Sequence, residues 1–518
     1  MRRSRVLAGL VATSIAAAGL VAGGALASPA PAQALTASQA TSSYDSFISK
    51  FWDPTAKYFY TCSDHLVHSE HAVDPQGGKY TDYWWGAQLW EMVMDRYQRT
   101  GDSASRAMID DVFAGFQAAY PDFKANDWND DMGWWAKASA RAYELTGETK
   151  FLDESKNIFA YISTFEDTTY GGGIWWKNVN VGNGSLNEKN VATNGTAIAT
   201  ALRLYADTGD ATYRDTAERL YTWLDSNFNR SGHIRDHVSG TGQFTDYDWT
   251  YNQGQFAEAA LQMYVATGTA SYLTESKSAI DWAVSNLTSS GTFLYEGDVD
   301  TAGFKAILTR DIRDLITAGG QTQYKSLLTA NASQIANHVN SDGIGGYDWT
   351  APTPALATQP VQSLGAGAAV AIMQQALPDN SNAIVEGSGV YEAENAVRNG
   401  VNTESTNTGY TGRGYLAGWN STGTSVTFNV NVNAAGTYPI TFRYAAAAGD
   451  ASRQLIAPAG TATTITFPST GNWTTWSTIT AGVTLVQGSN AITLKLDTSA
   501  GNAAYLNLDN ATIDLNAH

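Results

Sequence analysis

The sequence predicts a multidomain protein in which an all-α (α/α)6 barrel is followed by an all-β sandwich of the jelly-roll type. Apolar residues recur at helical spacing from about residue 36 to residue 377, and one turn motif is repeated within that stretch. From about residue 390 onward, apolar and polar residues alternate as they do in half-buried strands. The short polar segment 378–389 separates the two patterns, and we interpret it as a linker between domains 35–377 and 390–518.

The first 34 residues are predicted to be a secretory signal peptide. Arg2, Arg3 and Arg5 form a cationic start, a stretch rich in alanine and glycine follows over 6–27, and 29–34 supplies a small-residue cleavage site. A membrane anchor is the alternative, because the apolar stretch is nearly long enough to span a bilayer. The cleavage signal favours secretion, by either the general or the twin-arginine route. The mature protein is therefore expected to be extracellular and not bound to a membrane.

Composition excludes several classes of partner. The chain has 31 Lys and Arg against 49 Asp and Glu, a net charge of −18, whereas a binder of nucleic acid or of anionic membranes needs a basic surface. The single cysteine, Cys62, excludes an intrachain disulfide and a CxxC metal site. The 16 tryptophans and 26 tyrosines suit a neutral, ring-shaped ligand such as a sugar. We expect the protein to be a monomer.

The repeated turn motif predicts pairs of helices. Tyr-x-x-Thr-Gly occurs at 97–101, 143–147, 205–209 and 264–268. Its glycine can adopt the left-handed conformation that ends a helix, and a polar residue that can begin the next helix follows. The predicted pairs are 40–51 with 82–99, 103–118 with 129–145, 150–164 with 192–207, 211–227 with 251–266, 271–286 with 303–317, and 321–340 with 359–377.

Loop lengths alternate along these pairs. Connections between pairs are short turns, whereas those inside pairs are mostly long and carry tryptophan, glycine and asparagine. This alternation places the long loops on one face, and six helical hairpins of common hand can close into a ring; an open solenoid is the alternative. Functional residues gather on loops that a rigid scaffold holds in place. The starts of the second helices should therefore surround one site.

Two adjacent carboxylates, Asp130 and Asp131, lie at one of these helix starts. Glycoside hydrolysis needs two carboxyl groups, one to donate a proton and one to attack the sugar or activate a water. Neighbouring Cα atoms are about 3.8 Å apart, so the roughly 5–5.5 Å separation found in retaining enzymes is attainable and the wider inverting separation is hard to reach. Alternatively, one aspartate caps the helix and the other favours its dipole. Another pair, Asp110-Asp111, lies mid-helix, and we interpret it as part of a solvated face.

Four motifs resemble the signatures of glycoside hydrolase family 76. They are Trp128-Asn-Asp-Asp-Met-Gly-Trp-Trp-Ala136, Gly172-Gly-Ile-Trp-Trp176, Ala192-Thr-Asn-Gly-Thr196 and Thr250-Tyr-Asn-Gln-Gly254. That family consists mostly of retaining endo-α-1,6-mannanases of (α/α)6 fold, in which the adjacent aspartates form the catalytic pair. The resemblance implies that Asp130 is the nucleophile and Asp131 the general acid/base. Asp311 departs from the pattern, because an aromatic residue is expected there.

The helix starts and the resemblance together define a predicted substrate site, at which no catalytic cofactor is expected. Aromatic faces would stack on sugar rings, and amides and carboxylates would bind hydroxyl groups. The candidates are Trp84, Trp85, Gln88, Trp128, Trp175, Trp176, Asn194, Asp248, Tyr251, Asn252, Gln253 and Phe304. The charge of Asp130 and the flanking Trp134 and Trp135 should raise the pKa of Asp131. If Asp130 is not the nucleophile, Asp248 is the first alternative.

The C-terminal domain resembles carbohydrate-binding modules of families 35 and 6. Segments 425–432, 437–444, 481–486 and 491–496 are predicted strands of a β-sandwich. The motifs that carry the resemblance are Tyr391-Glu-Ala-Glu-Asn395, Gly409-Tyr-Thr-Gly-Arg-Gly-Tyr415, Gly471-Asn-Trp-Thr-Thr-Trp476 and Asn507-Leu-Asp509.

The resemblance implies a structural Ca²⁺ in this module. Glu392, Glu394 and Asp509 would hold it through hard oxygen ligands. It also implies ligand contacts by Tyr410, Trp473 and Asn502, whereas Trp476 is expected to lie in the core.

The sequence thus predicts a secreted, retaining glycoside hydrolase that cleaves internal α-1,6-mannosidic bonds of α-mannan. Two alternatives stay open. A transglycosidase on the same scaffold would share the covalent intermediate and differ only in the acceptor. A non-catalytic glycan-binding protein is disfavoured by Asp130-Asp131 and by the aromatic residues around them.

Overall fold

The helical part of the chain contains the predicted helices, with boundaries within a few residues of those expected. The computed structural model describes residues 35–68, 77–146, 148–181, 187–208, 210–267, 269–377, 390–411, 414–432, 435–458, 461–486 and 488–513. The predicted signal peptide and the predicted linker lie outside these described residues. The α-helices are α1 (Ala37–Phe51), α2 (Tyr83–Thr100), α3 (Ser103–Ala119), α4 (Asn129–Thr146), α5 (Thr149–Ser163), α6 (Val191–Thr208), α7 (Ala211–Phe228), α8 (Thr250–Thr267), α9 (Ala270–Asn286), α10 (Phe304–Thr317), α11 (Lys325–His338) and α12 (Ser363–Gln375).

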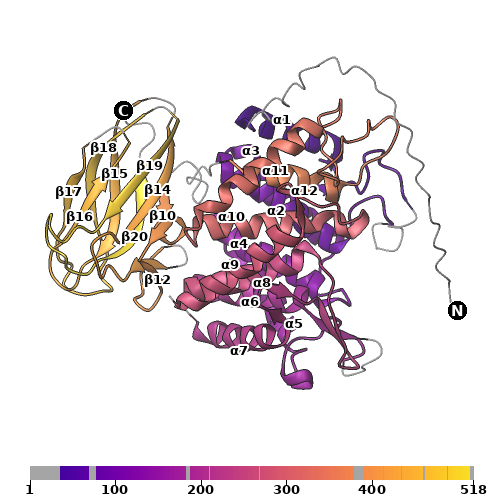
Figure 1. The fold of residues 1–518 in the computed structure, drawn as a ribbon, viewed down its shortest axis with the longest axis horizontal. Helices are drawn as coiled ribbons and strands as arrows, with labels where there is room; N and C mark the ends of the chain where they lie inside the picture. Colours follow the sequence, from indigo (N-terminus) through magenta and orange to yellow (C-terminus); the bar gives the residue numbers. More distant parts are fainter. Residues whose placement is uncertain are drawn as a thin grey trace, which may run out of the picture. The chain divides into compact units, whose positions relative to one another are not determined.

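The even-numbered helices form a closed inner ring. Each packs against the next along the series α2, α4, α6, α8, α10 and α12, and α12 packs back against α2. Figure 1 labels these helices. The odd-numbered helices form the outer layer, with α3 on α2, α5 on α4, α7 on α6 and α9 on α8. Because the ring closes on itself, the domain is an (α/α)6 barrel, and the open-solenoid alternative is wrong.

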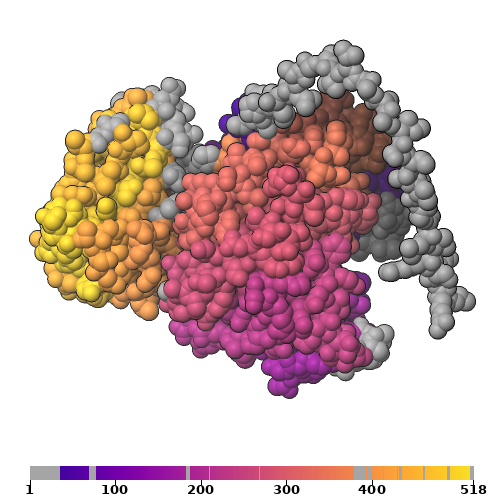
Figure 2. Space-filling view, viewed as in Figure 1, coloured from indigo at the N-terminus to yellow at the C-terminus, as the bar shows by residue number. Residues whose placement is uncertain are grey.

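Burial separates the two layers. Every residue of α6 from Val191 to Tyr205 is buried, whereas α7 buries only one stripe. A helix that is covered on all sides lies inside a domain, and an amphipathic helix lies at its surface. On the face that Figure 2 shows, the helical domain presents a continuous surface of closely packed atoms.

The turn motif ends its helix as predicted at the copy that the structure describes. Gly101 adopts φ 66° after α2, and its amide donates to the carbonyl oxygen of Tyr97 at 2.7 Å. The carboxylate of Asp102 then caps α3 by accepting from the amide of Ser105 at 2.7 Å. The other three motif glycines, Gly147, Gly209 and Gly268, lie outside the described residues.

Short strands join the long loops at one end of the ring. The pairs β1 (Trp52–Asp53) with β2 (Tyr58–Phe59), β4 (Asn229–Arg230) with β5 (His233–Ile234), and β8 (Thr288–Ser289) with β9 (Thr292–Phe293) are hairpins. A three-stranded sheet of β3 (Glu188–Asn190), β6 (His237–Ser239) and β7 (Phe244–Thr245) links the loop before α6 to the loop before α8. Its register places Asn190 opposite His237.

The C-terminal domain is a β-sandwich of two antiparallel sheets. One has the order β12-β13-β20-β15-β18, with β10 also paired to β20, and the other has the order β11-β14-β19-β16-β17. The strands are β10 (Val390–Glu392), β11 (Val397–Asn399), β12 (Asn402–Glu404), β13 (Tyr415–Ala417), β14 (Ser425–Val432), β15 (Gly436–Ala445), β16 (Ala451–Ile456), β17 (Thr463–Phe467), β18 (Ser477–Leu485), β19 (Gly488–Lys495) and β20 (Asn507–Ile513).

The four predicted strands are thus confirmed as β14, β15, β18 and β19, and the central strand β20 was missed. β20 is buried on both faces although it carries Asn507, Asp509 and Asn510, so it shows no alternation of apolar and polar residues. The prediction that Trp476 lies in the core is wrong. It is half-buried and outside the core, and its indole donates to the carbonyl oxygen of Thr408 at 3.0 Å.

Among the described residues, no helix has the length and apolar character that a membrane crossing requires.

A buried ionic network crosses the inner ring. Asp95 on α2 is 1% exposed and pairs with Arg141 of α4 at 2.8 Å and with Arg310 of α10 at 3.0 Å. Arg313 of α10 contributes a third pair at 3.3 Å, and the amide of Gln375 on α12 donates at 2.9 Å. These contacts hold the pKa of Asp95 below its usual range despite burial. One carboxylate therefore joins four of the inner helices.

Asp95→Asn should destabilise the helical domain. The substitution removes the negative charge that compensates three buried arginines, and breaking a buried pair in this way costs about 3–5 kcal/mol. We expect a lower midpoint of chemical denaturation. Asp111→Asn is the matched control, because Asp111 pairs with Lys57 at the surface with 42% of its side chain exposed, where a pair is worth about 0–1 kcal/mol. Equal midpoints for the two variants would contradict the role of Asp95.

Candidate active site

The start of α4 is held in place by backbone contacts to the loop before α6. Asn129 is fully buried. Its backbone amide donates to the carbonyl oxygen of Trp176 at 2.7 Å, and its side-chain amide donates to the carbonyl oxygen of Trp175 at 2.8 Å. These bonds fix the first turn of α4, which presents the half-buried side chains of Asp130 and Asp131.

The two carboxyl groups have different surroundings. Asp130 accepts hydrogen bonds from the side chain of Trp176 and, at 3.0 Å, from the backbone amide of Asp131. Burial raises the pKa of Asp130 to about 7, and the nearby charge of Glu188 adds to the rise. Asp131 accepts from the side-chain amide of Asn126 at 3.1 Å.

Burial and the charge of Asp130 raise the pKa of Asp131 well above its usual range, with further repulsion from Asp82 and Asp300. The direction agrees with the sequence-based expectation. These surroundings favour the protonated form of Asp131, as a proton donor requires.

These shifts distinguish the pair from helix caps. Asp102 and Asp210 cap their helices, and hydrogen bonds that they accept lower their pKa values. Asp130 and Asp131 have raised values instead. A raised pKa means that the surroundings destabilise the ionised carboxylate, which a capping role does not require. Groups with such perturbed pKa values gather at functional sites.

Aromatic side chains pack beside one another at the starts of inner helices, and the charge of Asp130 acts on one of them, Tyr251. We call the set Trp84, Phe304, Tyr251, Trp249 and Tyr247 the aromatic arc. Its consecutive ring centroids lie 6.2 Å apart for Trp84 and Phe304 and 4.5 Å apart for Phe304 and Tyr251. Trp249 lies 5.7 Å from Phe304 and 6.1 Å from Tyr247, which is 50% exposed. Trp128, 39% exposed, and Trp176 form a second aromatic pair, with centroids 6.5 Å apart.

A third carboxylate near the pair was missed by the sequence reasoning. Glu188 in β3 is the group whose charge acts on Asp130, and its Oε2 lies 3.5 Å from the Nε2 of His237. His237 Nδ1 lies 2.6 Å from Asp236 Oδ1, and Asp236 accepts from the hydroxyl of Tyr251 at 2.6 Å. The only signal available in the sequence was that these residues lie in long loops.

Asp248, the carboxylate that we named as the first alternative, has a different environment. It is exposed and pairs with the Nε2 of His233 at 2.9 Å. Glu188, by contrast, is one of the largest influences on the pKa of Asp130, which makes it a further candidate for a third carboxylate of the site.

Six predicted sugar contacts are buried beneath the site. The exposed fraction is 0–5% for Trp85, Gln88, Trp175, Asn194, Asn252 and Gln253. Their polar groups bind protein instead: the indole of Trp85 donates to Asp300 at 2.8 Å, and that of Trp175 donates to Asp167 at 2.9 Å. Because an inner helix is covered on all sides, adjacency to the loop end did not place these residues at the surface. The partly or fully exposed candidates are Trp84, Trp128, Trp176, Asp248, Tyr251 and Phe304.

Asp311, which departs from the family pattern, lies inside the barrel wall. It is 2% exposed on α10 and packs against Gly254 of α8, where an added Cβ would lie 2.6 Å from its Oδ2. Burial and the charge of Glu258 raise its pKa. The departure therefore lies in the packing of the inner ring.

The carboxylates predicted to hold Ca²⁺ in the β-sandwich are buried. Glu392, Glu394 and Asp509 are 5%, 0% and 0% exposed. The hydroxyl of Thr411 donates to Glu392 at 2.9 Å and contacts Asp509 at 3.1 Å, and Arg443 forms an ion pair with Asp509. The predicted ligand contacts lie nearer the surface, with Tyr410 and Trp473 half-buried and Asn502 exposed.

The comparisons with known proteins agree with this architecture. Residues 36–388 match the family model of glycosyl hydrolase family 76. The chain belongs to this family. Residues 392–514 match the model of carbohydrate binding module family 6.

Several curated relatives are mannosidases. A putative mannan endo-1,6-alpha-mannosidase of Schizosaccharomyces pombe is 26% identical over 305 residues, which cover 52% of this chain and 68% of the relative. Mannan endo-1,6-alpha-mannosidase DCW1 of Saccharomyces cerevisiae is 27% identical, over 50% of this chain and 64% of the relative. An isomaltosyltransferase of Sporosarcina globispora is 39% identical, but the match covers 24% of this chain and 11% of that protein.

Solved structures share the barrel. The GH76A alpha-1,6-mannanase of Salegentibacter sp. HEL1_6 aligns with a TM-score of 0.58 and 24% identity, over 65% of this chain and 98% of the other. Another structure with the same scores is an inactive variant of that enzyme, with two consecutive aspartates replaced by asparagine, in complex with alpha-1,6-mannotriose.

Asn194→Ala should destabilise the domain rather than remove a sugar contact. The Asn194 side chain accepts from the amide of Ile174 at 2.7 Å and donates to its carbonyl oxygen at 3.0 Å. Each buried group left without its partner costs about 1–3 kcal/mol, so the melting temperature should fall. Asn157→Ala, at an exposed position of α5, is the control. An unchanged melting temperature combined with weaker sugar binding would restore the original prediction.

Proposed function

We propose that this protein is a secreted, retaining endo-α-1,6-mannanase. The observation that carries the proposal is the pair Asp130 and Asp131, two adjacent carboxyls whose pKa values are both raised and whose surroundings differ. The aromatic arc lies at the starts of neighbouring inner helices. Membership of family 76 and the mannosidase relatives support the substrate class. The related inactive variant with two consecutive aspartates replaced supports the catalytic pair. Export rests on the predicted signal peptide.

The chemistry follows from the unequal environments of the two groups. Ionised Asp130 attacks the anomeric carbon while protonated Asp131 donates its proton to the departing glycosidic oxygen, so that a β-linked mannosyl-enzyme forms. The ester carries no charge, and the pKa of Asp131 therefore falls, since the charge of Asp130 contributes to its rise. Asp131 can then take a proton from the water that attacks the ester, which releases Asp130. Two inversions leave the product in the α configuration.

A transglycosidase would use the same two steps with a sugar hydroxyl in place of water. The matches to glycosyltransfer enzymes cover 24% of the chain, whereas the mannosidase matches cover 50–52%. Hydrolysis is therefore the better supported outcome, and the β-sandwich, as a carbohydrate-binding module, is proposed to hold the polymer.

Asp130→Asn and Asp131→Asn should each lower the rate of cleavage of debranched α-1,6-mannan by at least about 10²–10⁴-fold, because each removes a group that reacts with the sugar or transfers its proton. The melting temperature should hardly change. The wild-type digest, read by proton NMR before mutarotation, should show the α-anomer first.

Asp111→Asn, at the surface of α3, is the control for these substitutions and should cleave like the wild type. Full activity in either active-site variant would contradict the assignment of the pair, and a β-anomer appearing first would contradict Asp130 as nucleophile. New glycosides formed only with an added acceptor sugar would indicate transglycosylation, and binding without cleavage would indicate a glycan-binding protein.

Glu188→Gln should move the acid limb of the pH–rate profile to lower pH. Burial is the main cause of the raised pKa of Asp130, and the charge of Glu188 raises it further. Removing that charge lowers the pKa of Asp130, which then ionises at lower pH and can act as nucleophile there. Glu218→Gln on the outer helix α7, with 46% of the side chain exposed, is the control. A limb that stays in place or moves to higher pH would contradict the coupling.

We also propose that the β-sandwich binds a structural Ca²⁺ at Glu392, Glu394 and Asp509. These three buried carboxylates lie close enough for the charges of Glu394 and Asp509 to act on Glu392. Among the described residues Arg443 pairs with Asp509, and a divalent ion would offset the repulsion within the cluster. Burial and mutual repulsion raise the pKa of Glu392, and burial raises that of Asp509. Oxygen ligands of this kind suit Ca²⁺.

Adding Ca²⁺ after chelation should raise the melting temperature of the module in the full-length protein. An ion that binds only the folded state stabilises it by about 2.7 kcal/mol at a hundred times its dissociation constant. Glu394→Gln should abolish the response, whereas Glu404→Gln, at an exposed position of β12, should retain it. A melting temperature that does not depend on Ca²⁺ in the wild type would contradict this site.

A further inference from the structure

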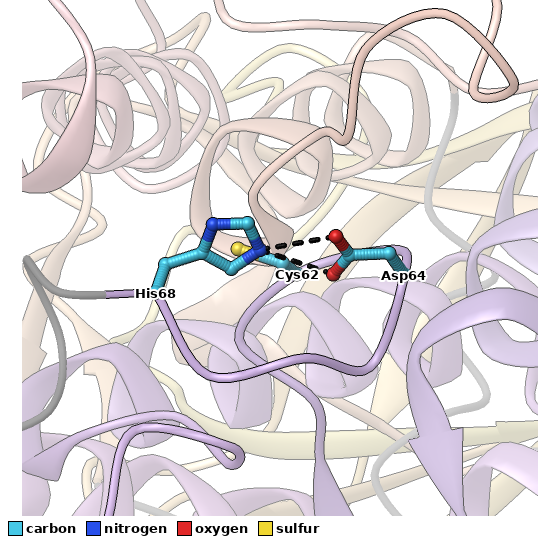
Figure 3. A group of neighbouring side chains, drawn as sticks. All are labelled: Cys62, Asp64 and His68. Atoms are coloured by element: carbon cyan, nitrogen blue, oxygen red, sulfur yellow. Dashed lines mark hydrogen bonds and ion pairs between the residues drawn. The ribbon is translucent and has the colours of Figure 1, made fainter.

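The loop between β2 and α2 brings together three side chains of the kinds that bind transition metals. They are Cys62, Asp64 and His68, and Figure 3 shows the imidazole of His68 directed at the carboxylate of Asp64 with the sulfur of Cys62 close beside the ring. One ligand atom from each residue, a sulfur, an oxygen and a nitrogen, lies within 4.8 Å of the other two. Both carboxylate oxygens of Asp64 lie 3.1 Å from the Nε2 of His68.

The spacing suits a tetrahedral ion. Zinc binds sulfur at about 2.3 Å and nitrogen or oxygen at about 2.0–2.2 Å, which places neighbouring ligand atoms about 3.3–3.6 Å apart. The oxygen and nitrogen atoms are already at nearly that separation, and the sulfur lies within 4.8 Å of both. A mixed set of thiolate, imidazole and carboxylate favours Zn²⁺ over Ca²⁺ or Mg²⁺, which take oxygen ligands.

The backbone holds the sulfur in place. The amide of Ser63 donates to the carbonyl oxygen of Val361 at 3.0 Å, and the amide of Ser363 donates to the carbonyl oxygen of Thr61 at 2.8 Å. Between these bonds, the backbones of Cys62 and Gln362 form an isolated antiparallel β-bridge. Cys62 is thereby fixed beside the start of α12 with 2% exposure. The side chains of Asp64 and His68 are 27% and 29% exposed, so an ion can reach them from solvent.

We propose that Cys62, Asp64 and His68 bind Zn²⁺ with a solvent molecule in the fourth position, and that the ion fastens this loop beside the start of α12. The proposal does not depend on the proposed mannanase activity. The alternative is a surface ion pair between Asp64 and His68 next to a buried cysteine that contributes only to packing. The two differ in one observable property, which is a bond between the metal and the sulfur.

Another group, Glu188, Asp236 and His237, also brings ligand atoms within 4.8 Å of one another. Its members offer only oxygen and nitrogen. A hydrogen bond joins His237 to Asp236, Asp236 accepts another from Tyr251, and Glu188 lies 3.5 Å from His237. The calcium candidates of the β-sandwich offer only oxygen. Because Cys62 is the single cysteine of the chain, any thiolate-to-metal signal comes from the proposed site.

The test is a titration of the full-length protein, stripped of metal with EDTA, with Co²⁺ as a spectroscopic substitute for Zn²⁺. We expect a sulfur-to-cobalt charge-transfer band in the near ultraviolet that saturates at one ion per chain and disappears when Zn²⁺ is added. Cys62→Ser should abolish the band. Asp64→Asn and His68→Gln should each weaken Co²⁺ binding by at least about tenfold.

His65→Gln is the matched control, because His65 lies in the same loop but stacks on Tyr60, with ring centroids 3.8 Å apart. It should bind Co²⁺ as the wild type does. Absence of the band in the wild type would overturn the proposal, and so would a band that survives both Asp64→Asn and His68→Gln. If Cys62→Ser does not fold, the partly exposed His68→Gln variant decides the outcome on its own.

Discussion

The helical domain depends on the ion pairs that the carboxylate of Asp95 forms inside the inner ring. This carboxylate receives arginines from α4 and α10 and an amide from α12. Buried charges are tolerated only when they are paired and hydrogen-bonded, so the arginines require the ring to be closed around this group. Closure in turn brings the loop-bearing ends of the inner helices together. The position of the active site therefore depends on the pairing of buried charges inside the barrel, because this pairing accompanies closure of the ring.

At the active site, burial and nearby charges shift the pKa values of the carboxyl groups upward, opposite to the shift of Asp95. Asp130 and Asp131 are half-buried beside further carboxylates: the charge of Glu188 acts on Asp130, and those of Asp82 and Asp300 act on Asp131. Burial and repulsion therefore raise both pKa values, whereas the cations around Asp95 hold its pKa low. The fixed position of the pair comes from neutral amides: Asn129 ties the helix start to the loop before α6, and Asn194 holds the backbone of Ile174.

Clustered carboxylates have different partners in the two domains. The barrel interior places Glu91, Asp95 and Glu258 against Arg141, Arg310 and Lys137, and its charges are balanced within the protein. The β-sandwich places Glu392, Glu394 and Asp509 close together, with Arg443 paired to Asp509, and the repulsion among these carboxylates makes a divalent ion a suitable proposed partner. The strand that carries Asp509 is central, so such an ion would stabilise the sheet as well as the loop around Thr411.

The sequence by itself determined the helices, the β-sandwich strands with strong alternation, and the pair Asp130-Asp131, because periodicity and turn residues act over a few neighbouring positions. It also indicated two aromatic candidates that are not buried, the exposed Trp128 and the half-buried Phe304. Only the tertiary structure decided that Trp85, Asn194 and Gln253 lie beneath the site, since burial depends on which helix covers which face. Glu188 and His237 meet through three-residue strands from two separate loops, and pairing over that distance leaves no periodic signal in the chain.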